Sequence, residues 1–128
     1  MDRVLERLNY LISDRKDEYE SSLQQWYKES RYYKEPTLKE LFGESIGNDI
    51  SKFKTALEQG DDISCFVSYF DDEAKNYGKS WYDEDLNCIR PGYEFEAKVC
   101  FNLRNIAAQA IGVPEARWEN YYEGYGRA

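Results

Sequence analysis

The chain has 128 residues, 41% of them hydrophobic and 16% aromatic, and its formal net charge at pH 7 is −8. This composition excludes an intrinsically disordered chain, and the lack of a long uncharged apolar run excludes a membrane span. A chain of this length buries enough surface to fold without metal ions or disulfides, so we expect one helical domain over residues 1–128. Because the N-terminus becomes amphipathic at once, with no apolar leader, the expected location is cytoplasmic.

The N-terminal residues predict a long amphipathic helix. Apolar side chains recur every three or four residues from Val4 onward, and the last of this stripe are Trp26 and Tyr27. Such spacing is typical of a helix with one buried face, and Pro36 prevents its continuation. We therefore expect a helix as long as residues 2–34, with a break in its apolar stripe at residues 15–18.

The middle of the chain predicts further short helices, each bounded by glycine or proline. A capping-box pattern opens at Thr37 and Glu40, and apolar spacing continues on both sides of Asp71. That continuity favours a helix there, although residues 63–70 alone would also suit a strand. The expected segments are a helix over 37–43, a helix over 50–57 ending at Gly60, a helix over 63–77 ending at Gly78, a loop over 79–92 and a final helix over 114–124.

The segment from Tyr93 to Ile111 is the expected centre of the fold. It contains no Gly or Pro, and apolar side chains occupy most of its helical circumference. Its narrow polar stripe consists of Glu94, Lys98, Asn102, Asn105 and Gln109. A helix of this kind is normally buried on several sides. We therefore predict an all-α fold, a small bundle of four to six helices around a central buried helix at about residues 93–111.

The absence of histidine excludes many catalytic mechanisms. Without His there is no Ser-His or Cys-His nucleophile pair and no usual zinc site, and no glycine-rich phosphate loop is present. A pair of carboxylates remains chemically possible, as in glycosidases. Among 25 acidic residues, however, such a pair is easily a coincidence. We therefore expect no enzyme activity and no cofactor.

Two further patterns concern metal ions and thiols. Asp83, Asp85, Asn87 and Glu94 have the spacing of calcium ligands in an EF-hand loop, but Cys88 occupies the position that requires glycine. Glu94 is as well explained by pairing with Lys98 one helical turn later. We therefore expect no metal site. The three cysteines, Cys65, Cys88 and Cys100, are widely spaced among apolar residues, which predicts buried, reduced thiols.

The net charge is concentrated in one stretch. Residues 58–85, which we call the acidic segment, contain nine acidic and two basic residues and so carry seven of the eight net negative charges. Like charges crowded together destabilise a compact fold, whereas an acidic patch steers a basic partner toward the surface. A solvated face that serves only solubility is the alternative. Aromatic side chains among the acids favour an interface, because such anchors are typical of binding hot spots.

The expected interface takes its residues from this segment. The candidate partner-binding residues are Asp61, Asp62, Tyr69, Asp71, Asp72, Glu73, Tyr77, Trp81, Tyr82, Asp83, Glu84 and Asp85. Nucleic acid is not the expected partner, because phosphate contacts require Lys and Arg. A basic protein such as a nuclease toxin or another nucleic-acid-binding enzyme suits the surface better. We expect no direct contact with nucleic acid or membrane.

Three functions agree with this surface. The leading hypothesis is a small inhibitor that occludes the active site of a nuclease, as bacterial immunity proteins do for colicin-type or contact-dependent growth inhibition toxins. The first alternative is a phage or plasmid DNA mimic that inhibits restriction or CRISPR enzymes. A mimic should carry an excess of acids over much of its surface, whereas here the excess of acids over bases is concentrated in one segment. The second alternative is an acidic adaptor or structural module.

Overall fold

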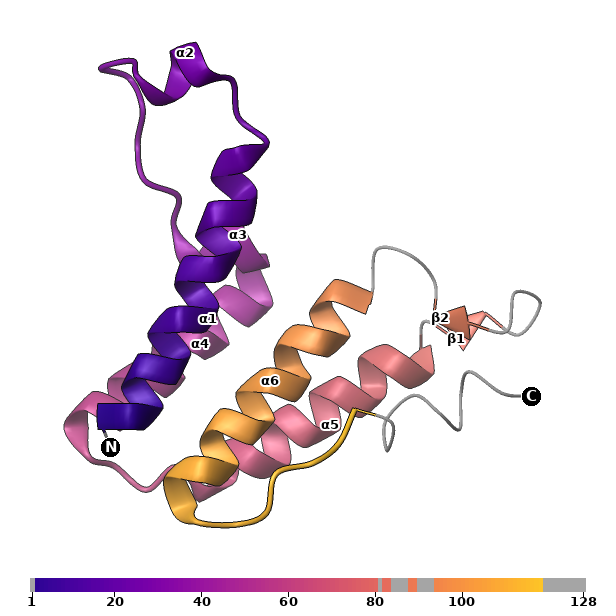
Figure 1. The fold of residues 1–128 in the computed structure, drawn as a ribbon. Coiled ribbons are helices and arrows are strands. Elements are labelled where there is room, and N and C mark those ends of the chain that lie inside the picture. Colours follow the sequence, from indigo (N-terminus) through magenta and orange to yellow (C-terminus); the bar gives the residue numbers. More distant parts are fainter. Residues whose placement is uncertain (1, 81, 84–87, 90–93, 119–128) are drawn as a thin grey trace. The chain divides into compact units, whose positions relative to one another are not determined.

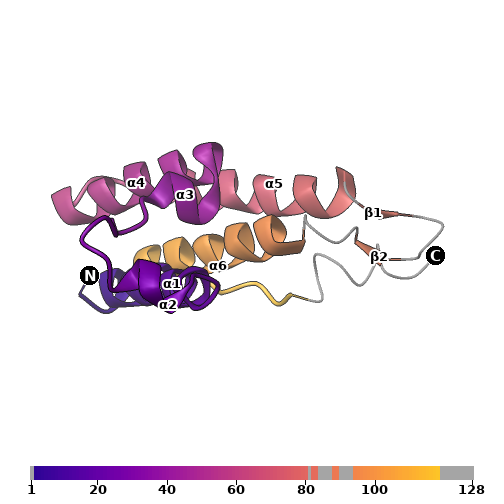
Figure 2. The same ribbon diagram turned by 90° about the horizontal axis from the view of Figure 1, so that it is seen from above.

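The computed structural model describes residues 2–80, 82–83, 88–89 and 94–118. These residues form six α-helices and one pair of two-residue strands (Figures 1 and 2), which confirms the all-α fold class. None of these helices has the length and apolar character that crossing a bilayer requires. The chain divides into two compact units, Met1–Gln59 and Gly60–Ala128. A single domain over residues 1–128 therefore stays a prediction.

The first unit is built from four helices: α1 (Asp2–Ser21), α2 (Gln25–Lys28), α3 (Leu38–Phe42) and α4 (Glu44–Gln59). Contacts connect α1, α3 and α4 in all three pairings. Their buried apolar side chains are Val4, Leu8, Leu41, Phe42, Ile46, Ile50, Phe53 and Leu57. Figure 1 shows α2 beyond the C-terminal end of α1, in a connection that then returns to α3.

The break in the apolar stripe of α1 has a structural role. Arg15 lies within the interrupted stretch, and its Nε donates a hydrogen bond of 2.8 Å to the carbonyl of Leu41 in the last turn of α3. Carbonyls in the last turn of a helix have no partner within the helix, and a cation there also complements the helix dipole. Arg15 therefore connects α1 to α3 through this hydrogen bond. An apolar residue at this position could not donate to the Leu41 carbonyl.

The expected helix over residues 2–34 is wrong in length, because α1 ends at Ser21. The hydroxyls of Ser21 and Ser22 donate to the carbonyls of Glu18 and Tyr19, at 2.7 and 2.6 Å. Serine side chains compete in this way for the groups that would otherwise continue a helix. The next helix is the separate single turn of α2.

The short helix α3 forms as expected. The Thr37 hydroxyl oxygen accepts from the backbone N–H of Glu40 at 3.2 Å, and Gly43 ends the helix with a positive φ of 91°. The following helix, α4, begins earlier than expected, at Glu44, and stops before Gly60, whose φ is 72°. Only glycine adopts such left-handed conformations without steric cost, so these two residues define where the helices end.

The second unit contains α5 (Ser64–Ser80), β1 (Tyr82–Asp83), β2 (Cys88–Ile89) and α6 (Glu94–Ile111). The helices α5 and α6 lie side by side and antiparallel (Figure 1). Helix rather than strand is confirmed over residues 64–70, but α5 begins one residue later than expected, at Ser64, and continues through Gly78. The expected loop over 79–92 instead includes the antiparallel pairing of β1 with β2, with Tyr82 opposite Ile89.

The expected central helix is confirmed as α6, and its interior face is nearly closed to solvent. Its buried residues are Ala97, Val99, Cys100, Leu103, Asn105, Ile106, Ala107 and Ala108. Phe70 and Ala74 of α5 are also buried in this unit, as is Ile63, the residue before α5. Glu94 pairs with Lys98 at 3.2 Å, as expected for two side chains one turn apart. Packing of the first unit's helices on α6 stays a prediction.

Asn105 does not belong to an exposed polar stripe, because it is only 4% exposed. Its Oδ1 accepts from the backbone N–H of Ala116 at 2.8 Å, and its Nδ2 donates to the carbonyl of Ala116 at 3.0 Å. The final helix expected over 114–124 is therefore wrong over its described residues, 114–118, of which 114–117 are irregular and 118 is a turn, and Asn105 attaches this segment to α6. Residues 119–124 lie outside the described part.

The cysteine prediction is correct for Cys100, which is buried, and wrong for Cys65, which is exposed. Cys65 is the second residue of α5, on the side of the helix away from the buried Phe70 and Ala74. Its apolar neighbours in the sequence, Phe66 and Val67, point in other directions because successive helical positions are about 100° apart. The side chain of Cys88 lies outside the described residues.

Gly47 generates the first prediction, because α3 and α4 approach closely there. A Cβ at Gly47 would lie 2.9 Å from the backbone carbon and oxygen of Leu38 and from the nitrogen of Lys39. Backbone atoms cannot move aside as side chains do, so Gly47→Ala should destabilise the protein by about 1 to 3 kcal/mol. Urea unfolding followed by circular dichroism measures the change.

The matched control is Ser51→Ala, one turn later on α4, where the side chain is exposed. It should leave stability unchanged or raise it slightly, since alanine is the better helix former. Equal stability of the Gly47→Ala variant and the parent would contradict the close approach of α3 to α4.

Candidate partner-binding surface

The acidic segment begins in the turn between α4 and α5. Asp61 and Asp62 follow Gly60, and both side chains are exposed. Asp62 also has a local structural role, because its Oδ1 accepts from the backbone N–H of Ser64 at 3.0 Å and from the Ser64 hydroxyl at 2.8 Å. These two hydrogen bonds favour the charged carboxylate and lower the pKa of Asp62. Asp62 thereby caps the start of α5, and both acids face solvent.

Along α5, one exposed stripe combines an aromatic residue with an acid. Cys65, Tyr69, Asp72 and Asn76 are all exposed and are spaced by four, three and four residues, which places them on one side of the helix. Tyr69 is 40% exposed, and its ring packs edge-on against Phe70 at a centroid distance of 5.5 Å. The tyrosine is therefore fixed by the core while part of its ring remains open to a partner beside Asp72.

Asp71 lies on a different side of α5 and is engaged within the unit. Its Oδ2 is 2.8 Å from Nζ of Lys75, and its Oδ1 is 3.6 Å from Nε of Arg104 on α6. The side chains of Asp71 and Arg104 are only 23% and 16% exposed. The negative charge of Asp71 is thus matched by two cations, so this residue contributes less to the outward field than its position in the sequence indicated.

The remaining candidate residues divide into two groups. Glu73 and Tyr77 are half-buried on α5. The side chains of Trp81, Tyr82, Asp83, Glu84 and Asp85 lie outside the described residues, so their place in an interface stays a prediction. Within the described part, the structure brings Tyr69 and Asp72 together on one stripe, exposes Asp61 and Asp62 just before it, and directs Asp71 toward α6.

The described residues hold no group of three or more Cys, Asp or Glu side chains placed to bind a metal ion. Of the four positions with EF-hand spacing, only Glu94 has a described side chain, and its carboxylate pairs with Lys98. The side chains of Asp83, Asp85 and Asn87 lie outside the described residues.

The structure shows a second exposed aromatic surface, near residues 26–33, which the predicted helix over residues 2–34 did not indicate. Trp26 and Tyr32 are 69% and 67% exposed, although the expected helix placed Trp26 on its buried face. The sequence feature that could have indicated this surface is the presence of four aromatic residues within residues 26–33. Their spacing is compatible with a helix stripe, which is why periodicity alone assigned the first two to the core.

Comparison with known proteins adds no assignment. No protein-family model, no curated protein and no solved structure matches this chain. The candidate surface therefore depends on the chain's own residues and their geometry.

The two neighbouring aspartates of α5 generate the second prediction. Asp71→Asn removes the charge that faces Lys75 and Arg104, so it should destabilise the protein by about 1 to 2 kcal/mol, between the values for exposed and buried ion pairs. Asp72→Asn, one residue later and exposed, is the matched control and should be neutral. Urea unfolding distinguishes the two, and equal effects would contradict the ion-pair assignment.

The pH dependence of stability generates the third prediction, at Asp62. Because folding lowers the pKa of this carboxyl, the unfolded chain binds its proton more readily. The stabilisation is therefore present above the ordinary pKa of Asp and is lost as pH falls through the lower pKa of the folded state. Melting temperatures of the parent and of Asp62→Ala should differ most near neutral pH and converge in acid. A difference independent of pH would contradict this role.

Proposed function

We propose that this chain is a small acidic inhibitor that binds a basic protein, in the manner of an immunity protein that neutralises a nuclease-type bacterial toxin. The observation that carries the proposal is the concentration of seven of the eight net negative charges in residues 58–85. The exposure of Asp61 and Asp72, with Tyr69 beside Asp72, supports it.

The proposed mechanism is occlusion of the nuclease active site. Carboxylates occupy the positions of substrate phosphates against the toxin's Lys and Arg side chains, which gives fast association and specificity for a basic cleft. Tyr69 supplies a desolvated anchor whose ring is held in place by Phe70. The DNA-mimic alternative is less well supported, because the net negative charge is concentrated in one segment and Asp71 is matched by Lys75 and Arg104.

The fourth prediction follows from the proposed function. If the chain is an immunity protein, the gene directly upstream of its own should encode a nuclease toxin, and the purified product of that gene is the binding partner in the test. The double variant Asp61→Asn, Asp72→Asn keeps the side-chain size and should fold like the parent. Its binding should weaken by about 0.2 to 1 kcal/mol for each charge at the rim, or by about 2 to 5 kcal/mol where the acid is desolvated and paired. Calorimetric titration and a nuclease-protection assay measure the two effects.

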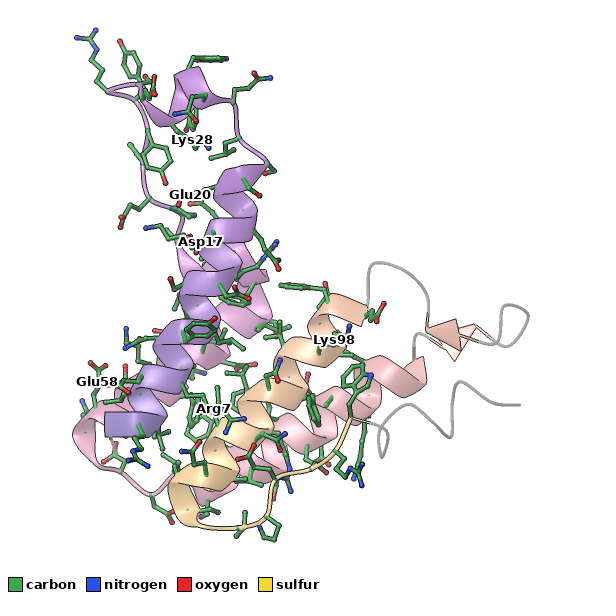
Figure 3. The ribbon with its side chains drawn as sticks, viewed as in Figure 1. Arg7, Asp17, Glu20, Lys28, Glu58 and Lys98 are labelled. Carbon is green, nitrogen blue, oxygen red and sulfur yellow. The ribbon has the colours of Figure 1, made fainter. Side chains whose placement is uncertain are left out.

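The matched control is Asp14→Asn with Asp17→Asn, two exposed aspartates of α1, of which Asp17 is labelled in Figure 3. This variant removes the same charge outside the acidic segment and should protect like the parent. If the Asp61→Asn, Asp72→Asn variant protects fully at low ionic strength, the described part of the acidic segment serves solubility and is not the interface. Failure of the parent chain to bind the neighbouring nuclease would reject the immunity function itself.

A further inference from the structure

The connection between α1 and α3 carries a dense group of aromatic side chains. We call residues 24–34 the aromatic tip; it includes α2 and contains Trp26, Tyr27, Tyr32 and Tyr33. Figure 3 shows its side chains around Lys28, the labelled residue of α2. A single exposed aromatic residue is unremarkable on a protein surface, but Trp26 and Tyr32 are both about two-thirds exposed within one short segment. Such clustering is typical of a binding surface.

The aromatic tip is held in shape by contacts within the segment. The ring of Tyr27 packs edge-on against Trp26 at 6.1 Å and against Tyr33 at 6.0 Å. Backbone hydrogen bonds of 3.1 Å run from Tyr27 to Gln24, from Ser30 to Tyr27 and from Tyr33 to Ser30. A surface that is already ordered loses little conformational entropy when a partner binds. The exposed rings are therefore presented on a folded turn.

The charges of the tip leave a cationic outer surface. Glu29 accepts a hydrogen bond from Gln25 at 2.8 Å, and Glu35, just beyond the tip, pairs with Lys16 of α1 at 2.9 Å. Lys16 offsets the charge of Glu35, whereas Glu29 keeps its charge because the Gln25 amide is neutral. The tip is cationic because Lys28, Arg31 and Lys34 outnumber Glu29. Arg31 is exposed and lies over the Tyr32 ring, 5.0 Å from its centroid, with one Nη donating to the Tyr32 hydroxyl at 2.8 Å. A guanidinium has five N–H donors, so others remain for a ligand.

We propose that the aromatic tip is a docking surface for an acidic segment of a partner protein. Trp, Tyr and Arg are the residue types that most often dominate protein interfaces, and an arginine stacked on an aromatic ring pairs well with carboxylates. The tip is locally positive although the net charge of the chain is −8. This favours a short acidic segment that contacts the tip alone over nucleic acid or an anionic membrane, whose extended negative charge would also face the rest of the chain. The tip belongs to the first unit and has the opposite charge from the acidic segment, so this inference does not rest on the proposed function.

The fifth prediction tests this surface with a random 16-residue peptide library displayed on phage and selected against the whole chain. The selected peptides should combine Asp and Glu with apolar residues. Trp26→Ala and Arg31→Glu should each weaken their binding by about tenfold or more in fluorescence titrations, the loss expected for a hot-spot residue. Tyr10→Ala is the matched control, because Tyr10 is 74% exposed on α1 outside the tip. It should leave binding unchanged.

Circular dichroism should show that all three variants fold, since the substituted side chains are exposed. Selected peptides that lack acids, or that bind the Trp26→Ala variant as well as the parent, would overturn the proposal. A selection that yields no tip-dependent peptide would do so too. The proposal would also be rejected if anionic vesicles or single-stranded oligonucleotides bound in a tip-dependent way, or if the chain dimerised through the tip in sedimentation. Each of these results would assign the surface to a different occupant.

Discussion

A helix that is apolar around most of its circumference must be covered on more than one side, and this constraint shapes the second unit. One side of α6 is covered by α5. Residues 113–118 cover another, where the Trp118 ring packs edge-on against Phe101 at 5.3 Å and lies 5.7 Å from Nζ of Lys98. Asn105 attaches the same segment through both backbone groups of Ala116. A helix that continued through Ala116 would need the carbonyl of this residue for its own hydrogen bond.

The acidic segment shows how charge along a sequence differs from charge on a surface. Successive residues of a helix point about 100° apart, so Asp71 and Asp72 have different surroundings although they are adjacent in the chain. Asp72 is exposed, whereas Asp71 is matched by one cation from its own helix and one from α6. The outward acidic surface is therefore narrower than the residue count indicates. For the described residues, the proposed partner contacts rest on Asp61, Tyr69 and Asp72.

The two candidate surfaces differ in chemistry. The stripe on α5 combines a partly buried tyrosine with carboxylates, which suits a basic partner. The aromatic tip presents Trp26 and Tyr32 beside Arg31, while Glu29 and Glu35 are engaged by neighbouring side chains. Tyrosine and tryptophan give a rigid contact area at low entropic cost, so a small chain with 12 tyrosines and three tryptophans is well supplied for recognition. None of the described tyrosines and tryptophans is fully buried.

Much of the local structure was predictable from the sequence. The capping box at Thr37, the glycines that end α3 and α4, and the apolar span that becomes α6 all depend on neighbours within a few residues, which a sequence displays directly. The Glu94 pair with Lys98 is also local, because the two residues are one turn apart. These local features were enough to predict the all-α fold class, which the elements of the structure then confirmed.

Only the tertiary structure decided which side chains face the core and which polar groups find distant partners. Periodicity placed Trp26 on the buried face of a long helix. Instead, α1 ends at Ser21, where the hydroxyls of Ser21 and Ser22 bond to backbone carbonyls, and Trp26 lies beyond this end and is exposed. The sequence pattern placed Asn105 on an exposed stripe, but its side chain hydrogen-bonds to Ala116, 11 positions away. Likewise, Arg104 of α6 pairs with Asp71 of α5. The sequence by itself determined where α3, α5 and α6 form and where acids concentrate. Which acids remain open to a partner also depended on a cation from another helix, because Asp71 faces Arg104 of α6 as well as Lys75 one turn away on its own helix.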